Sequence, residues 1–169
     1  MISGGRTGDV ERFPPAVAAV LSRAGWHAGR RDDGRARDWA LRVAGHVAPD
    51  GRQHHVVGPA FDAYAEYGGL RVEPPGSGEQ IAPSTFHLDP MRAVHTVATL
   101  GGLGAALRQP LSPLGVTTDG PGILAIDALG RVFVLDHGGD WYLGPAAPEA
   151  ITALVLGLRP ARVDLDGTW

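Results

Sequence analysis

Seven histidines are the first residues in this chain that could do chemistry, and three of them lie close together in the sequence. His46, His54 and His55 are candidate metal ligands, since imidazole nitrogen is a common ligand of zinc. Adjacent His54 and His55 point in different directions on a helix, however, and neither cysteine nor an H-E-x-x-H pattern accompanies them. We therefore expect no metal site and predict that these histidines are exposed at the end of a helix.

His137 and Asp140 are a second candidate, because a His/Asp pair near a turn could act as a general base. No nucleophile is apparent beside them, so a solvated turn between two strands is the preferred interpretation. A small hydrolase that uses His137 or His54 is kept as an alternative, which loss of a measured activity on His→Ala substitution would support.

The remaining patterns that resemble catalytic motifs are incomplete. Residues 101–104, Gly-Gly-Leu-Gly, resemble a phosphate-binding loop, but they follow a predicted helix and no lysine accompanies them, so a helix break is expected. The chain contains no lysine and no cysteine, which excludes Schiff-base chemistry, thiol nucleophiles and disulfides. We predict that the protein is not an enzyme and needs no cofactor.

Charge is unevenly distributed along the 169 residues, a length that suggests one domain. Residues 1–42 carry a net charge of +3, whereas residues 43–169 carry −6. An acidic body disfavours direct binding of nucleic acid and is compatible with a basic protein partner, while a solvated acidic surface without a partner is an equally good interpretation. The longest apolar run, within 150–158, is too short to span a membrane, and the first residues lack the apolar region of a signal peptide. We expect a soluble, cytoplasmic protein.

Hydrophobic spacing and turn residues predict the elements that must position these side chains. Helices are expected at about 14–25, 35–47, 61–68, 89–100 and 149–156, and strands at 70–72, 85–88, 123–127, 131–135 and 141–144. Pro110 and Pro113 are expected to mark irregular chain that leads to Leu114-Gly115-Val116. The second helix should present Trp39, Val43 and Val47 on one face. The hairpin 123–135 is apolar on both faces, which indicates a covered, central part of a sheet. Tight hairpins mixed with helices predict a single α+β domain, with a mixed, mostly antiparallel sheet flanked by helices.

The segment 61–72 is the most informative of these elements. Phe61, Tyr64 and Ala65 share one helical face, and Gly68-Gly69 is predicted to end the helix because glycine adopts the left-handed conformation at little cost. A strand then begins at residue 70. A helix that turns sharply into a strand over two glycines is therefore expected.

These features, in this order, resemble the third group of the SUKH superfamily of bacterial immunity proteins. The main positions that carry the resemblance are Trp26, Phe61, Gly68, Gly69, Asp89, Pro90, Gly130, Tyr142 and Gly144. The resemblance covers about residues 12–160, so that 1–11 are predicted to be a flexible lead-in and 161–169 a C-terminal tail. It implies that the named positions are structural, as turn glycines, a helix cap and core aromatics.

The resemblance also implies a non-enzymatic function, because proteins of this kind are similar to antidotes encoded beside polymorphic toxins. Many such toxins are nucleases or nucleic-acid deaminases, and the antidote covers the active site of its cognate toxin. The expected partner is a protein toxin domain, and the expected state a monomer or weak dimer. Contacts are predicted on exposed acids and one strand aromatic: Glu73, Glu79, Asp119, Asp136, Asp140 and Trp141. A scaffold or regulatory module without a toxin is the alternative.

Overall fold

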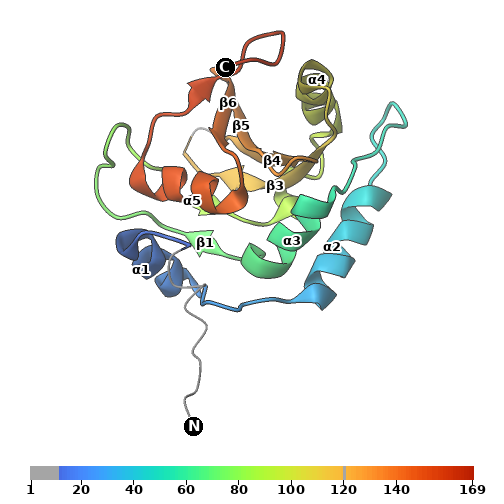
Figure 1. Cartoon of the computed structure of the whole chain (residues 1–169). Coiled ribbons are helices and arrows are strands. Elements are labelled where there is room, and N and C mark those ends of the chain that lie inside the picture. Colours follow the sequence, from blue (N-terminus) through green and yellow to red (C-terminus); the bar gives the residue numbers. More distant parts are fainter. Residues whose placement is uncertain (1–11, 120) are drawn as a thin grey trace.

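A computed structural model describes residues 12–119 and 121–169 of the chain, so the predicted lead-in 1–11 lies outside the described residues (Figure 1). The helices are α1 (Pro15–Ala24), α2 (Asp33–Gly45), α3 (Gly58–Tyr67), the 3-10 helix η1 (Pro90–Ala93), α4 (Val97–Leu107) and α5 (Ala147–Leu156). The strands are β1 (Arg71–Val72), β2 (Phe86–His87), β3 (Leu111–Thr117), β4 (Ile123–Asp127), β5 (Val132–Asp136), β6 (Gly139–Gly144) and β7 (Ala161–Arg162).

The strands form one sheet in chain order, β1 to β7, and each neighbouring pair is antiparallel. This confirms the predicted single α+β domain. Helices α1, α3 and α5 cover one face, and α4 lies on the other (Figure 1). Along β4, Leu124 and Ile126 join the larger core on the first face, whereas Ala125 joins a smaller core on the second. The predicted covering of the hairpin is therefore correct, and both of its faces are covered.

The two glycines after α3 have different roles, which corrects the prediction that both adopt the left-handed conformation. Gly69 does so, with φ of +84°. Gly68 has φ of −56°, which any residue tolerates. It must lack a side chain for another reason: a Cβ there would lie 2.3 Å from the Tyr64 carbonyl oxygen and 2.7 Å from the Trp39 ring. Close packing, rather than backbone conformation, requires glycine at 68.

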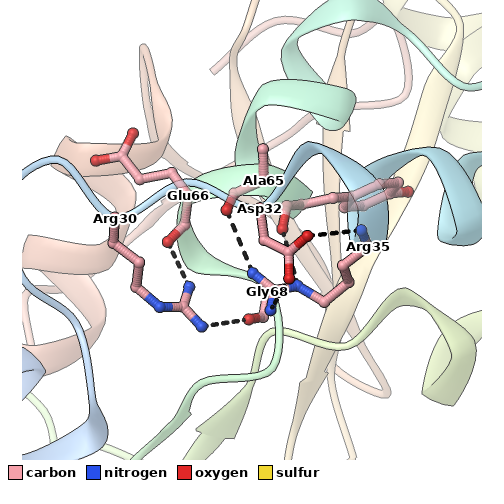
Figure 2. Close-up of polar contacts among 7 residues, drawn as sticks. Arg30, Asp32, Arg35, Ala65, Glu66 and Gly68 are labelled. Atoms are coloured by element: carbon pink, nitrogen blue, oxygen red, sulfur yellow. Dashed lines mark hydrogen bonds and ion pairs between the residues drawn. The ribbon is translucent and has the colours of Figure 1, made fainter.

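Two arginines hold the end of α3 (Figure 2). Arg30 donates from Nη1 to the Glu66 carbonyl at 2.5 Å and from Nη2 to the Gly68 carbonyl at 2.9 Å. Arg35 donates to the Ala65 carbonyl at 3.3 Å. The last carbonyls of a helix have no partner within the helix and carry its partial negative charge. The guanidinium groups donate hydrogen bonds to these carbonyls and bring positive charge to the end of the helix. They also fix the direction in which the chain enters β1.

The helix predicted at 89–100 is in fact two elements. The Asp89 side chain accepts a hydrogen bond from the Met91 amide at 2.9 Å, and Pro90 begins η1, as the predicted cap requires. The break comes before Val97 rather than at Gly101-Gly-Leu-Gly104, which lies inside α4. Three mid-helix glycines are unfavourable by roughly 1 kcal/mol each relative to alanine. Burial of Leu100 and Leu103 against the second face of the sheet opposes that cost.

Two further expectations from local sequence are wrong. Residues 111–117 form the regular strand β3, and Pro113 is accommodated because the register with β4 shifts between Pro113 and Gly115. Tyr64 donates its hydroxyl proton to the Pro113 carbonyl at 2.6 Å, which anchors α3 to this irregularity. Val47 follows α2, is 58% exposed and pairs with Gln53, so it is not on the buried face.

The C-terminal segment 161–169, predicted to be a tail, makes contacts with the sheet. Its first two residues form β7, which pairs with β6. Val163 is buried in the smaller core. The Trp169 ring stacks on Tyr142, with ring centroids 4.4 Å apart, and meets Phe133 edge-on at 5.8 Å. Val163 and Trp169 therefore pack on the second face of the sheet.

Candidate protein-binding site

One end of the sheet brings together all the residues predicted to contact a partner. In an antiparallel sheet that follows chain order, alternate connections lie at the same end, so β1–β2, β3–β4 and β5–β6 are joined there. These connections and the strand ends beside them carry Glu73, Glu79, Asp119, Asp136, Asp140 and Trp141. Sequence spacing alone gave no reason for these six residues, of which Glu73 and Trp141 are 68 positions apart, to lie at the same end of the sheet.

A cleft of about 380 Å³ opens at this end and includes three of the six residues, Asp119, Asp136 and Trp141. The segment 81–84 and the end of α5 with the residues after it contribute the rest of its lining, together with strand residues of the sheet. The lining is largely apolar, with Val134, Leu143 and Leu154 among its side chains. A volume of this size lies near the lower end of the roughly 300–1,000 Å³ usual for ligand sites.

The walls of the cleft are held together by backbone hydrogen bonds. The amides of Glu79, Gln80 and Ile81 donate to the Leu156 and Gly157 carbonyls at 2.8–3.0 Å. Gly157 has φ of +66°, and a Cβ there would lie 2.2 Å from the Ile81 carbonyl oxygen. Only glycine allows this approach. The cleft is consequently a preformed feature of the described structure.

Trp141 and Asp136 form a fixed pair at the cleft. The indole Nε1 of Trp141 donates to Asp136 Oδ1 at 3.1 Å, and the Gly138 amide donates to the same oxygen at 2.7 Å. Arg162 on β7 lies over the indole, with its Cζ 5.4 Å from the ring centroid. Oδ2 of Asp136 accepts no hydrogen bond from the residues that the structure describes. One carboxylate oxygen thus orients the tryptophan while the other stays available.

The other three predicted residues lie outside the cleft lining. Asp140 pairs with Leu135 in the β5–β6 register, so it faces the opposite side of the sheet from Trp141. Burial, and to a smaller extent the nearby charge of Asp136, raise the pKa of Asp140, which Arg162 opposes. Glu73 is ion-paired with Arg71, and the exposed Glu79 is attached to the cleft wall through its backbone.

Several cleft residues escaped the sequence analysis. Ile81, Leu158 and Arg159 line the cleft together with Val134, although they come from three distant parts of the chain. No periodicity connects them, because tertiary packing alone makes them neighbours. The only local signals were Gly157 and the proline at 160, which marked the end of a helix.

The histidines form no metal centre in the part of the chain that the structure describes, where no group of three or more His, Cys, Asp or Glu side chains could hold an ion. His54 is buried rather than exposed, which corrects the prediction. Its Nε2 lies 2.7 Å from the Val94 carbonyl oxygen, and burial lowers its pKa. His137 is exposed on the β5–β6 turn.

The positions that suggested a family resemblance have evident structural contacts. Trp26 is buried and meets Phe13 edge-on at 5.1 Å, while Phe61 is half-buried against the larger core. Gly130 has φ of +88° in the β4–β5 turn. A Cβ at Gly144 would lie 3.0 Å from the backbone of α5, so glycine there permits the helix to approach β6.

Comparison with known proteins identifies the family. The family model described as SUKH-3 immunity protein matches residues 13–157, from the start of α1 through the end of α5. The chain belongs to the SUKH-3 immunity protein family. Neither the curated proteins nor the solved structures contain a match to the chain. The resemblance inferred from sequence is confirmed.

Membership of the SUKH-3 immunity protein family implies a toxin as the partner, and such families are generally non-enzymatic. The matched range includes the whole cleft apart from Leu158, Arg159 and Pro160. It ends before β7, so the segment that carries Arg162 and Trp169 lies beyond the part of this SUKH-3 protein that the family defines. None of the helices within 12–119 and 121–169 is long and apolar enough to cross a membrane.

Proposed function

We propose that this SUKH-3 protein neutralises one cognate toxin by binding its catalytic domain through the cleft end of the sheet and covering the active site. Family membership carries the proposal. The cleft supports this end of the domain as the place where the toxin binds, since it combines apolar walls, a half-buried tryptophan and exposed carboxylates. Tryptophan is among the residues that most often dominate binding energy at protein interfaces.

The proposed target is a toxin that acts on nucleic acid, either a nuclease or a deaminase. Such an enzyme must neutralise phosphate charge with basic side chains around its active site. The acidic body of this chain, at −6 over residues 43–169, is complementary to such a surface. We propose that the protein works in the cytoplasm, as a monomer or weak dimer, and contacts the toxin rather than the nucleic acid.

Co-expression tests the proposal. A bacterial host should be protected when this protein is produced together with its cognate toxin, which is to be sought first among toxin-like C-terminal domains encoded by neighbouring genes. Failure to protect, with no complex between the two purified proteins, would contradict the proposal and favour a scaffold or regulatory module.

Association kinetics then test the location of the site. The double variant Asp119→Asn/Asp136→Asn should lower the association rate constant by roughly tenfold at low salt, because two steering charges are lost. Glu149→Gln is the matched control, since this exposed acid lies in the first turn of α5, at the other end of the helix from the cleft. If the association rate constant changes neither in the double variant nor with added salt, the interface lies elsewhere on the protein.

A further inference from the structure

The cleft at the end of the sheet has an apolar interior and charged groups beside it. Ile81, Val134 and Leu143 contribute aliphatic surface, and Asp119 and Asp136 contribute carboxylates. Among the described residues, no arginine or histidine nitrogen lies within 4 Å of either carboxylate. A ligand that fills this cleft well must therefore combine a long apolar stem with a positively charged head.

We infer that the cleft receives one arginine side chain from a surface loop of the toxin, an inference that rests on the proposed function. Arginine carries three methylene groups that can lie along apolar surface while its guanidinium group reaches polar atoms. The planar guanidinium can also stack on an indole and donate two parallel hydrogen bonds to a carboxylate. In the cleft, Trp141 offers the face of its ring, and Asp136 offers Oδ2, the carboxylate oxygen that accepts no hydrogen bond from the described residues.

The chain itself shows that Trp141 accepts such a contact. Arg162 lies over the indole from the neighbouring strand and is outside the cleft lining. The hydrogen bond from Trp141 to Asp136 fixes the ring, and the Gly138 amide fixes the carboxylate. Binding groups that are already ordered lose little conformational entropy when a partner arrives, which favours affinity from a small contact area.

Arginine fits this cleft better than lysine. The lysine ammonium is a compact, strongly hydrated charge, whereas guanidinium is planar, weakly hydrated and suited to stacking on an aromatic ring. One residue of the lining opposes a positively charged ligand. Arg159 also borders the cleft, and its exposed side chain is itself positively charged. Two carboxylates therefore face one resident guanidinium, which leaves a local net charge of −1.

A peptide titration tests the inference without the toxin. The probes are the capped tripeptides Gly-Arg-Gly and Gly-Lys-Gly at equal chloride concentration, and the readout is the indole N–H signal of Trp141 in nuclear magnetic resonance, assigned with Trp141→Phe. We expect a saturable shift with the arginine peptide in the millimolar range and affinity about tenfold weaker for the lysine peptide, the loss expected from roughly one charge-assisted hydrogen bond. Equal affinities, or no saturable shift, would overturn the inference.

Matched variants locate the contact. Asp136→Asn should weaken binding of the arginine peptide by about tenfold, whereas Glu149→Gln, which removes the same charge in the first turn of α5, should change it less than about twofold. Arg159→Gln should strengthen binding, because it removes the competing cation. Identical effects of Asp136→Asn and Glu149→Gln would mean that the overall charge of the protein, and not the cleft, attracts the peptide.

The two proposals fail separately. If the protein protects cells from the toxin but the arginine peptide leaves Trp141 unchanged, the proposed function stands and the arginine cleft is wrong. If the arginine peptide binds as expected but no toxin is neutralised, the cleft is a guanidinium site of this fold and the proposed function is wrong.

Discussion

Replacing Gly68 by alanine is the sharpest test of how this fold turns from helix α3 into strand β1. The added methyl carbon would lie 2.3 Å from the Tyr64 carbonyl oxygen, 2.7 Å from the Trp39 ring and 2.9 Å from Arg35 Nε. Ordinary contacts of a Cβ begin at 3.4 Å, so the carbonyl and the methyl group must separate by about 1 Å. Neither backbone atoms nor a packed ring can give way without disturbing the end of α3.

The expected loss can be estimated from the groups that must move. Overpacking costs about 1–3 kcal/mol, and weakening a hydrogen bond to a charged group such as Arg35 costs up to about 1.5–3 kcal/mol. We expect Gly68→Ala to lower the free energy of unfolding by about 3–4 kcal/mol, a large share of the 5–15 kcal/mol typical of a domain. Gly69→Ala meets no atom within 4 Å and is strained only by its φ of +84°, so it should cost about 1–2 kcal/mol.

Urea unfolding followed by tryptophan fluorescence measures both losses. Gly102→Ala is the control, since this helical glycine also has open space around it and its replacement should stabilise the protein by about 0.5–1 kcal/mol. If Gly68→Ala costs no more than Gly69→Ala, then steric exclusion at residue 68 is not what requires glycine, and the account of the joint is wrong.

Asp127 is fully buried and binds Arg131 through Nε and Nη2, both at 2.7 Å, so Asp127→Ala should lower the free energy of unfolding by about 3–5 kcal/mol. A loss below about 1 kcal/mol in urea unfolding would refute a structural role for this pair. Burial holds the pKa of His54 below its usual 6.5, so the unfolded chain binds the proton more readily and stability should fall as pH drops below about 6.5. His54→Gln should reduce the difference in melting temperature between pH 7 and pH 5. If that difference is unchanged, other titratable groups cause the pH dependence of stability. Trp169→Ala should lower the free energy of unfolding by about 1–2 kcal/mol, because the stack on Tyr142 is lost. An unchanged free energy of unfolding would mean that Trp169 does not hold the segment 161–169 to the sheet.

Local sequence was sufficient where neighbouring residues alone set the conformation. Helix α1, with Pro15 at its start and Gly25 in the left-handed conformation after its end, agrees with prediction. So does the hairpin of β4 and β5, with Gly130 at φ of +88° in its turn. In these places the apolar period and a turn residue with special backbone freedom specify the structure over a few residues. The family resemblance followed from such positions, since their order along the chain is itself a sequence property.

Tertiary packing decided the rest. Gly101 to Gly104 lie in a helix because Leu100 and Leu103 bury themselves on the sheet, which local propensity does not register. Asp119 and Asp136 were candidate contacts from the sequence, but only the folded structure shows that they share a cleft with Ile81 and Arg159, which come from distant parts of the chain. Propensities and turns act over a few residues, whereas burial and close approach depend on residues that are distant in sequence. Local sequence therefore determined α1, the β4–β5 hairpin and the family resemblance, while the folded structure determined which residues line the cleft.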